Sequence, residues 1–373
     1  MSATRGTTLP EESNMTATLE FDASRFTRTI DGLPVALYTL RNGNGMVAKI
    51  TNYGGKVEQI LVPDRDGAPG DVALGYDSID AVLAGQPSMG AFIGRFANRI
   101  RNARFDLNGE SVALTVNAGQ HSLHGGTRGS RFRVFAARQL DESSLELMYV
   151  FQDGEEGYPG TLPVRVIYRV TEANGLRMEW SAAAVDKETV ANFTNHTFFN
   201  LGADPTKPVL DTEITIDADR FIALDEGGFP SGELRRVDGS ALDFRTARSV
   251  AAGLALDDAQ VRLANGFDHH FILNRQGTAD RLEFAARAYH PASGRQLEVW
   301  SSEPGMQFFT GNNLAGKLPA DAGKDGKAFV FRGGFCLEPS RFPDSPNHPE
   351  FPSTSVQPGD FYTGCIEYRF STR

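Results

Sequence analysis

Short runs of β-branched and aromatic residues recur along the chain from about Leu37 onward, and this recurrence restricts the fold more than any other feature. The runs include VALYTL, MVAKITNY, VEQILVPD, LELMYVF, VRVIYRV and LRMEWSAAAV, and they are separated by turns of Gly, Asn, Asp and Pro. Such residues fit the half-buried surface of a pleated strand, and the turn residues mark where strands end. The sequence therefore predicts an all-β fold.

Helical periodicity is scarce. Residues 78–84 and 244–254 are predicted to form short helices, but no long amphipathic stripe competes with the strand pattern. Residues 1–18 are small, polar and charged, so we expect a disordered N-terminal extension there. A chain of this length often divides into two domains. No linker interrupts the strand spacing, however, and residues 19–373 are predicted to form a single domain.

Charge and composition exclude several classes of partner. The 37 basic and 47 acidic residues give a net charge of −10 without any basic run, so nucleic acid is not expected to bind. No apolar stretch approaches the ~20 residues of a spanning helix, and the first residues lack the apolar core of a signal peptide. We therefore expect no membrane partner and a cytoplasmic location. The two cysteines, Cys336 and Cys365, are expected to be free thiols, with one bridge left open.

His196 lies in the segment NFTNHTFFNLG, which otherwise reads as a strand. Strand alternation would place Thr194, Phe198 and Asn200 on the same face as this imidazole. Aromatic faces cover the C–H side of a sugar ring, amides and hydroxyls meet its OH groups, and an imidazole transfers protons near neutral pH. The pattern favours a sugar site, with a purely structural histidine as the alternative.

Further segments accompany this histidine in a fixed order. They are RFANRI at residues 95–100, SLHGG at 122–126, CLEP at 336–339 and NHPEFP at 347–352. Together with NHTFFNLG they resemble the aldose 1-epimerase (galactose mutarotase) family, from about Thr51 to the C-terminal GDFYTGCIEYRF. The resemblance implies one large twisted antiparallel β-sandwich of the supersandwich type, with an open sugar cleft on one sheet face.

The same resemblance implies an activity, the interconversion of the α and β anomers of a free aldose by ring opening and closure. Glu338, in a hydrophobic FCLEP context, would be the base at the O1 hydroxyl, since a carboxylate there is costly unless it has a role. His196 would be the acid that protonates the ring oxygen O5. The ordinary pKa values of the two groups permit the required pair of carboxylate and imidazolium under mildly acidic conditions.

Five more residues match substrate-binding positions of the family: His124, Asn98, Arg99, Asp268 and Gln307. The glycines after His124 allow the backbone to approach a sugar closely. Asn98 and Arg99 offer hydrogen-bond donors, Asp268 is an acceptor, and Gln307 reaches the sugar by resemblance. Structural roles for these residues remain the alternatives, and Arg95 is expected to be structural. Tyr158, in a GEEGYPG-like loop, is a candidate for the cleft wall.

The chain also departs from the family pattern. His270 replaces an amide in a DHNF-like motif, Phe309 replaces a tyrosine, and Phe198 stands where relatives have a hydroxylated aromatic. After Glu338, residues 339–341 read PSR where many relatives have a Thr-Gln pair. Galactose, glucose and pentoses therefore all stay open as substrates. A sugar phosphate stays open too, with Arg341 or Arg128 as the cations nominated for it.

Other functional classes are weaker. The pairs His121/His124 and His269/His270 lack a third ligand nearby in sequence, so no metal and no cofactor are expected. The glycine-rich stretch 125–129 lacks the Lys-Ser/Thr pair of a phosphate loop. A glycoside hydrolase using Glu338 and Asp268 would not need two histidines. A non-catalytic sugar sensor would not need both proton-transfer groups. The expected partner is a monosaccharide, and the chain is expected to be a monomer or a homodimer.

Overall fold

A computed structural model describes residues 19–277 and 281–373. The predicted extension over residues 1–18 lies outside the described residues. Within these ranges strands dominate and helices are short, which confirms the all-β prediction. None of the helices in the described ranges has the length and apolar character needed to cross a bilayer.

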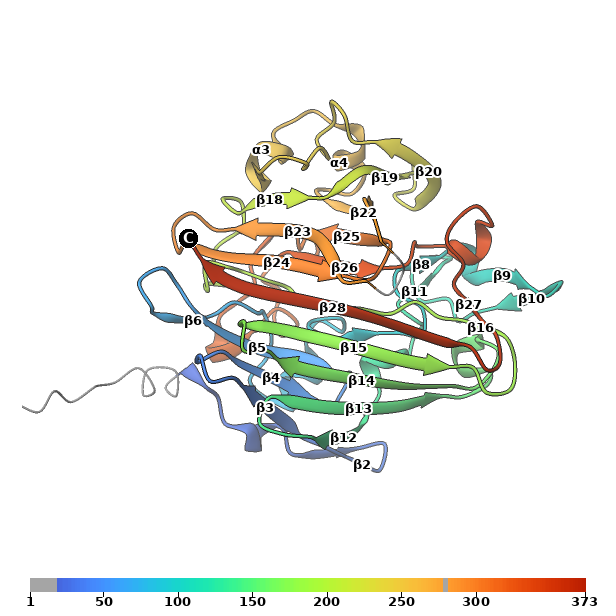
Figure 1. The fold of residues 1–373 in the computed structure, drawn as a ribbon, viewed down its shortest axis with the longest axis horizontal. Helices are drawn as coiled ribbons and strands as arrows, with labels where there is room; N and C mark the ends of the chain where they lie inside the picture. Colours follow the sequence, from blue (N-terminus) through green and yellow to red (C-terminus); the bar gives the residue numbers. More distant parts are fainter. Residues whose placement is uncertain (1–18, 278–280) are drawn as a thin grey trace, which may run out of the picture.

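The largest sheet is antiparallel and runs across the front of the molecule in Figure 1. In spatial order, its strands within the described residues are β12 (Ala136–Gln139), β13 (Ser144–Phe151), β14 (Leu162–Val170), β15 (Gly175–Ala183), β28 (Phe361–Thr372), β24 (Arg295–Ser301), β23 (Glu283–Tyr289), β18 (Glu213–Ile216) and β21 (Arg248–Ser249).

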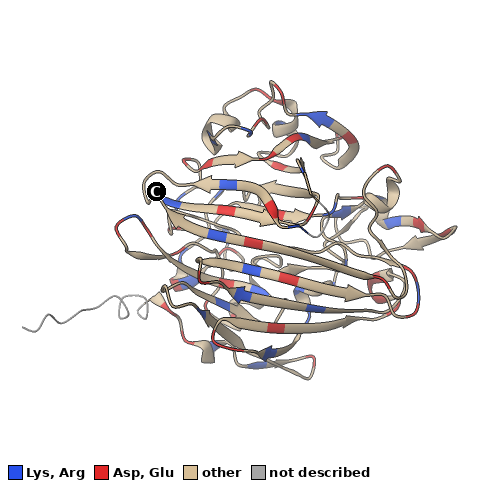
Figure 2. Ribbon diagram, in the orientation of Figure 1, with Lys and Arg blue, Asp and Glu red and all other residues tan. Residues whose placement is uncertain are grey.

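Strand alternation separates the two faces of this sheet. On β14, Val164, Val166 and Tyr168 are buried, whereas Arg165 is exposed. The Nε atom of Arg165 lies 2.6 Å from the Glu146 carboxylate on β13. Figure 2 shows acidic and basic positions interspersed along the strands of this sheet. One face of the sheet is therefore solvated, and the other is available for packing.

Two smaller sheets form the second layer. The first contains β3 (Leu37–Arg41), β4 (Val47–Thr51), β5 (Lys56–Pro63) and β6 (Pro69–Asp71). The second has the order β20 (Pro230–Arg236), β19 (Ala218–Leu224), β22 (Asp268–Leu273), β25 (Gly305–Phe309) and β26 (Cys336–Ser340).

One hydrophobic cluster joins the layers. It contains Val166 and Ile366 of the large sheet together with Ile60 and Leu337 of the smaller sheets. The hydroxyl of Tyr368 donates to the Leu337 carbonyl at 3.1 Å, which fixes β26 against the large sheet. This is the packing of two antiparallel layers over a shared core that the sandwich prediction requires. The single domain over residues 19–373 stays a prediction, which a continuous core supports.

Short elements complete the fold. The paired short strands are β1 (Arg28–Ile30) with β2 (Leu33–Val35), β9 (Arg104–Leu107) with β10 (Glu110–Ala113), β8 (Arg99–Ile100) with β11 (Ser122–Leu123), β16 (Thr189–Val190) with β27 (Ser355–Val356), and β7 (Phe92–Ile93) with β17 (Thr194–Asn195). The helices are α2 (Ile79–Ala84), α3 (Val250–Leu254) and α4 (Ala259–Leu263), with 3-10 turns η1 (Ala23–Phe26), η2 (Arg101–Ala103), η3 (Ser130–Phe132), η4 (Glu155–Gly157), η5 (Lys324–Gly326) and η6 (Ser345–Asn347).

The helix predictions are partly confirmed. Helix α2 begins after Ser78, whose hydroxyl accepts the N–H of Ala81 as an N-cap. The helix predicted over residues 244–254 is too long, because α3 begins only after Ser249, and Ser249 itself pairs with β18. Phe244 instead packs in the core.

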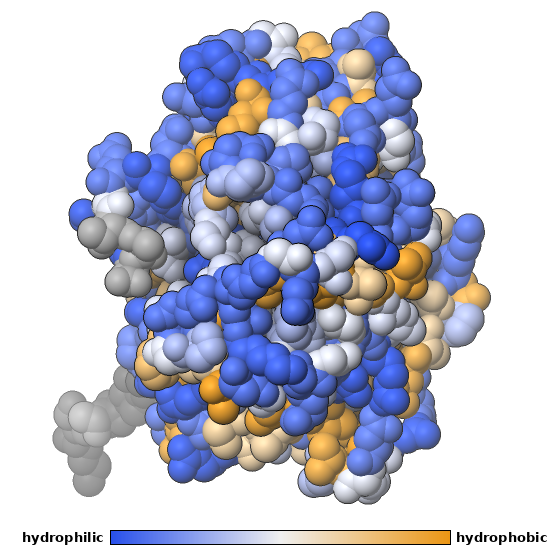
Figure 3. Space-filling model, turned by 90° about the vertical axis from the view of Figure 1, so that its right-hand side faces the viewer, coloured by the Kyte–Doolittle hydropathy of each residue, from blue (hydrophilic) through white to orange (hydrophobic). Residues whose placement is uncertain are grey.

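Hydrophilic residues cover most of the face shown in Figure 3, with hydrophobic residues scattered among them.

Candidate active site

A cleft of about 470 Å³ collects all seven residues that the sequence nominated. These are Asn98, Arg99, His124, His196, Asp268, Gln307 and Glu338. The other lining residues are Gln86, Pro87, Ser88, Met89, Leu123, Arg131, Phe198, Ala264, Asn265, Phe309, Asn312 and Asn313. The fold thus brings segments about 240 residues apart into one cavity, although the role of each residue stays a prediction.

The cleft floor follows from the register of three adjacent strands. Gln307 on β25 pairs with Glu338 on β26, and Asp268 on β22 pairs with Phe309 on β25. Directly opposed residues of antiparallel strands point to the same face. Because Gln307 and Phe309 are two residues apart, all four side chains share one face of this sheet.

His196 follows strand β17 and is not itself in a strand. The strand prediction was too long at this point, since β17 ends at Asn195. The histidine N–H nevertheless donates to the Ala91 carbonyl at 2.8 Å, and its own carbonyl accepts the N–H of Gly90 at 3.0 Å. These two bonds fix the backbone from which the imidazole enters the cleft.

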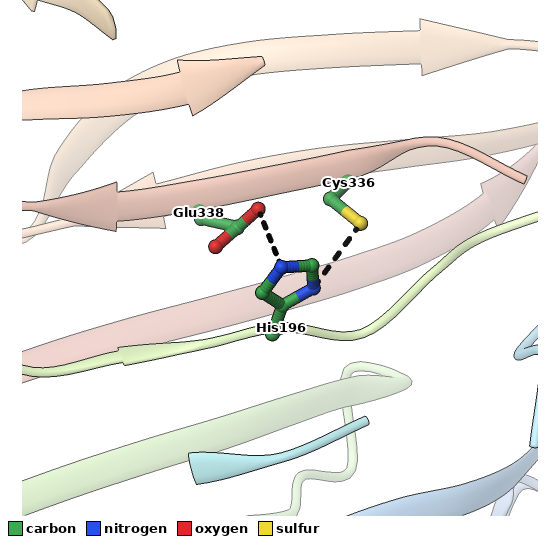
Figure 4. A group of neighbouring side chains, drawn as sticks. All are labelled: His196, Cys336 and Glu338. Atoms are coloured by element: carbon green, nitrogen blue, oxygen red, sulfur yellow. Dashed lines mark hydrogen bonds and ion pairs between the residues drawn. The ribbon is translucent and has the colours of Figure 1, made fainter. Parts of the chain in front are cut away.

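The imidazole of His196 lies between two side chains of β26, as Figure 4 shows. Its Nε2 atom is 3.6 Å from Oε1 of Glu338, and its Nδ1 atom is 3.6 Å from Sγ of Cys336. One ring nitrogen therefore faces the nominated base, and the other faces a buried thiol. Cys336 was treated only as a free thiol in the sequence. Cys336 and Cys365 are both free, as expected.

Aromatic rings form one side of the site. Phe198 stacks on His196 with ring centroids 5.1 Å apart, and Phe309 meets Phe198 edge to face at 5.9 Å. The prediction that Asn200 shares this face is wrong. Its amide nitrogen donates to three backbone carbonyls, and its side chain lies at a different cavity. The chain turns after Phe198, so strict alternation does not continue.

His124 is held by a reciprocal pair of bonds with Asn98. Its N–H donates to the Asn98 carbonyl at 3.0 Å, and its Nδ1 atom accepts the Asn98 N–H at 3.2 Å. In the neutral ring the proton is therefore on Nε2. His124 itself has a φ of 52°, and a Cβ atom at Gly125 would collide with the Gly94 carbonyl oxygen. The glycine is required for this close approach.

A chain of hydrogen bonds crosses the mouth of the cleft. The Asn98 amide donates to Oε1 of Gln307 at 3.0 Å, and Nε2 of Gln307 donates to Oδ1 of Asp268 at 2.6 Å. The Arg99 guanidinium lies 3.7 Å from the other Asp268 oxygen, and both side chains are about one quarter exposed. Asp268 and Arg99 are thus fixed polar groups in contact with solvent.

The predicted base and acid are far more buried. Glu338 is 4% exposed and His196 is 7% exposed. Burial raises the pKa of Glu338 well above its usual value, the Asp268 charge raises it further, and Arg99 opposes both. Burial lowers the pKa of His196 to about 4. Both shifts disfavour charge, so within the free site they favour a protonated carboxyl beside a neutral imidazole over the charged pair.

The donor set does not suit a metal ion. His196, Cys336 and Glu338 are the one group of three candidate ligands in the described residues, with ligand atoms within 4.8 Å of one another. The thiol faces Nδ1, however, while the carboxylate faces Nε2. The lone pairs of these nitrogens point in different directions, so a single ion at bonding distance cannot use all three side chains in this arrangement.

His269 and His270, on β22, point to opposite faces of their sheet: His270 pairs with Gln307 and shares the face of the cleft floor, whereas His269 pairs with Phe308 on the other face. Both imidazoles are buried, and neither residue lines the cavity. The His270 ring packs against Phe342 with centroids 5.4 Å apart, and neither of its nitrogens has a partner among the described residues. His121 contacts the Phe229 ring instead of a ligand group.

Two loop predictions have different outcomes. Arg95 is structural as expected, because its buried guanidinium donates to the Pro159 and Gly160 carbonyls and to the Thr189 hydroxyl. Tyr158 does not form the cleft wall. It is fully buried in a separate hydrophobic cluster.

The cations nominated for a phosphate also lie elsewhere. Arg128 pairs with Asp31 at the surface, and Arg341 lies 3.9 Å from the centre of the Tyr362 ring. Neither residue lines the cleft. Arg131 lines the cleft together with Arg99 but was not among the predicted residues. The only available signal was its position shortly after the SLHGG segment.

Comparisons with known proteins support the same assignment. The profile of the aldose 1-epimerase family matches residues 36–369. The chain belongs to this family. A galactose mutarotase from Bos taurus is 40% identical over 86% of this chain and 90% of its own length. An aldose 1-epimerase from Escherichia coli strain K12 is 35% identical over 91% of this chain and 96% of its own length.

Solved structures show the same fold. The aldose epimerase homologue from C. elegans superposes with a TM-score of 0.82 at 26% identity, covering 91% of this chain and 99% of the other. A galactose 1-epimerase from Lactobacillus acidophilus gives 0.79 at 27% identity, covering 92% and 97%. The predicted family and fold are confirmed, and the chain is an aldose 1-epimerase that acts on a monosaccharide.

The departures from the family pattern differ in their consequence for the cleft. Residues 339–341, which replace the Thr-Gln pair, do not line the cavity. Phe198 and Phe309 do line it, so this wall of the cavity carries no hydroxyl group from either ring. The substrate range is therefore expected to depend on the wall more than on the segment after Glu338.

Proposed function

We propose that Glu338 is the base at O1 and His196 is the acid at O5 in the interconversion of aldose anomers. The observation that carries this proposal is the 3.6 Å separation of Oε1 and Nε2 within one cleft. O1 and O5 are both bonded to C1 of the sugar, so the two proton-transfer groups must lie close together. Buried groups with strongly shifted pKa values are typical of catalytic acids and bases.

Each step balances without a cofactor. The Glu338 carboxylate removes the O1 proton, C1=O1 forms, and the C1–O5 bond breaks with its electron pair on O5. O5 takes the proton from Nε2 of His196. After rotation about C1–C2, the O5 hydroxyl attacks C1 from the other face of the carbonyl. Its proton returns to His196 while O1 recovers the proton from Glu338, so the protein ends as it began.

The Nδ1 proton of His196 stays in place through this cycle. Only Nε2 gives up and regains a proton, so the neutral intermediate form must carry its hydrogen on Nδ1. That nitrogen faces the Cys336 sulfur, and burial keeps the thiol protonated by raising its pKa well above the usual value. A neutral acceptor fixes the tautomer without the strong rise in imidazole basicity that a carboxylate would cause.

The remaining nominated residues would hold the sugar. Asp268 accepts a hydroxyl hydrogen, and Arg99 and Asn98 donate to hydroxyl oxygens. His124 donates from Nε2, and Gln307 keeps Asp268 in position through the bond at 2.6 Å. The rings of Phe198 and Phe309 cover the C–H face of the sugar. Galactose, glucose and a pentose are the neutral substrates we propose to test, with the protein as a monomer or homodimer and without nucleic acid or membrane partners.

Hydrolysis is less compatible with this arrangement. A glycosidase would need Asp268 as a free partner of Glu338. One Asp268 oxygen instead accepts from Gln307, and the other faces Arg99. A sugar sensor would not need the opposed acid and base.

Anomer exchange measured by saturation-transfer NMR tests the proposal. The protein should accelerate exchange of at least one sugar among galactose, glucose, xylose and arabinose, equally with and without EDTA. Glu338→Gln should abolish most of the acceleration, whereas Glu142→Gln, at an exposed carboxylate outside the cleft, should not change it. Sugar binding by calorimetry without any exchange would identify a sensor, and near-normal exchange in Glu338→Gln would refute the assigned base.

A further inference from the structure

Two guanidinium groups line the cleft, and they differ in their partners. Arg99 lies 3.7 Å from Asp268, but Arg131 forms no ion pair within residues 19–277 and 281–373. Its Nη1 atom donates to the Ser88 hydroxyl at 3.1 Å, and Nη2 makes a long bond of 3.4 Å to the Gly126 carbonyl. Nε has no acceptor in the described structure, and the residue is 7% exposed. A buried cation of this kind is normally paired.

Neighbouring arginines show how this fold usually satisfies such a charge. Arg133, two residues further on, lies 2.8 Å from the Glu155 carboxylate. Arg95 is buried but donates to three oxygen atoms and lies outside the cleft. Arg131 has neither arrangement. Its open side is the substrate cavity, so an anion from the substrate would supply the missing partner.

Nearby charges do not neutralise Arg131. Glu156 is the carboxylate that most affects it, but the Glu156 oxygens already accept the N–H groups of Thr127 and Arg128. Lys56 lies behind the cleft wall, where its ammonium donates to the Pro87 carbonyl at 2.5 Å. The opposite charge that acts on this ammonium is the carboxylate of the buried Glu58. The excess positive charge at this end of the cavity therefore belongs to Arg131.

The position of Arg131 selects one part of the sugar. Arg131 Nη2 bonds the carbonyl of Gly126, two residues after His124. Arg131 Nη1 bonds Ser88, two residues before Gly90, whose N–H donates to the His196 carbonyl, so the guanidinium lies on the imidazole side of the cleft. His196 is assigned to O5, and O5 is bonded to C5. The exocyclic carbon C6 is also bonded to C5. A group attached at C6 would thus be directed toward the side on which Arg131 lies.

We infer that the preferred substrate is an aldose with an anionic group at C6, either a carboxylate or a phosphate, and that Arg131 binds its oxygens. This inference rests on the proposed function, because it uses the placement of O5 at His196. Guanidinium groups bind both kinds of anion through paired N–H donors. A hexuronate presents its oxygens directly on C6, whereas a hexose 6-phosphate extends further, and the two are distinguished by experiment.

A second consequence concerns the acid. A bound anion offsets the Arg131 charge that disfavours the imidazolium form of His196. In the pH profile of kcat, the limb set by the pKa of His196 should therefore lie at higher pH with an anionic sugar than with its neutral counterpart. This shift should disappear when Arg131 is replaced.

The test compares matched sugars by exchange NMR: galactose with galacturonate, and glucose with glucuronate and glucose 6-phosphate. The wild-type protein should show a higher kcat/KM for an anionic sugar than for its neutral partner. Arg131→Met keeps the apolar stem and should remove that advantage, a loss of roughly ten- to a hundredfold, the effect of one charged hydrogen-bonded partner. Arg131→Lys should restore part of it. Arg128→Met, three residues earlier and outside the cleft, is the matched control and should behave as wild type.

The outcomes separate this inference from the proposed function. Exchange of neutral sugars without a preference for any anionic one would refute the inference and leave the proposed function intact. Equal losses for neutral and anionic sugars in Arg131→Met would also refute it, because they indicate a structural role. No exchange of any sugar would refute the proposed function itself. If Arg131→Met does not fold, the wild-type protein still decides: KM for the anionic sugar must rise with salt concentration while KM for the neutral sugar stays constant.

Discussion

The pH dependence of the two single variants, His196→Asn and Glu338→Gln, should show that the pKa of Glu338 lies above that of His196. This is the reverse of their ordinary order. The competent form contains the Glu338 carboxylate and the His196 imidazolium, and it holds one proton. The inactive form with a neutral imidazole and a protonated carboxyl also holds one proton. pH cannot change the ratio of two forms with the same proton count, so only the outer limbs of the profile respond to pH.

Burial determines how small the fraction of sites in the competent form is. Before any attraction between the two charges is counted, a carboxyl at its ordinary pKa of 4.5, set against an imidazole at about 4, would leave roughly one in four of the singly protonated sites in the competent form. Because burial raises the pKa of Glu338 well above 4.5, each further unit of separation would lower that fraction about tenfold. The acid limb of kcat/KM then belongs to His196, and the alkaline limb belongs to Glu338. This reverses the assignment that ordinary pKa values would give.

The variants isolate the two limbs. His196→Asn retains only the base, so its residual exchange should rise with pH through the elevated pKa of Glu338. Glu338→Gln retains only the acid, so its residual exchange should fall as pH increases beyond about 4. Rates are measured by saturation-transfer NMR on the best sugar, with the spontaneous rate subtracted at each pH. A midpoint near 4.5 for His196→Asn would refute the reasoning, because the carboxyl would then have its ordinary pKa.

Three further experiments, on a double variant and on two other single variants, test the remaining parts of the mechanism. Glu338→Gln and His196→Asn should each cost ~10² to 10⁴ in rate, and the double variant should be little worse than either in exchange NMR, since the two groups act as a unit; multiplied losses would contradict a concerted pair. Cys336→Ala should lower kcat a few fold at unchanged KM and free the His196 tautomer in ring-¹⁵N NMR spectra, with Cys365→Ala as the unaffected control. Asp268→Asn should reduce kcat/KM by roughly ten- to a hundredfold. It should also move the alkaline limb to lower pH, because the Asp268 charge raises the pKa of Glu338. An unmoved limb would show that Asp268 does not act on the pKa of the base.

Much of the fold could be predicted because its signals are local. Strand runs such as 162–170 alternate in burial just as their residues alternate in type. Predictions failed where tertiary bonds override a local pattern. The run around His196 looks like one long strand, but its backbone groups bond to Gly90 and Ala91 in a loop, and the chain then turns so that Asn200 leaves the cleft. Sequence periodicity contains no information about such distant partners.

The nominated residues converge on one cleft because each had a family motif around it. Arg131 lies outside these motifs, and Cys336 lies within CLEP without an assigned role, so the place of both in the site became visible only from the contacts. Tyr158 shows the opposite error. An aromatic residue in a glycine-rich loop suggested a cleft wall, but the loop folds inward and buries the ring in a separate cluster. Residue type alone does not decide which way a loop side chain points.

The separation of charges within the cleft explains how a rare protonation form can still support catalysis. At the mouth, the side chains of Asp268 and Arg99 lie 3.7 Å apart and both contact solvent. On the floor, burial disfavours charge on both Glu338 and His196. When a proton moves from the carboxyl to the imidazole, however, the two new charges are only 3.6 Å apart. Their attraction at an effective dielectric constant near 20 is about 4 to 5 kcal/mol, which offsets roughly three units of unfavourable pKa separation. This attraction is present only while both partners remain in place, so removing either one should disfavour the charged form of the other.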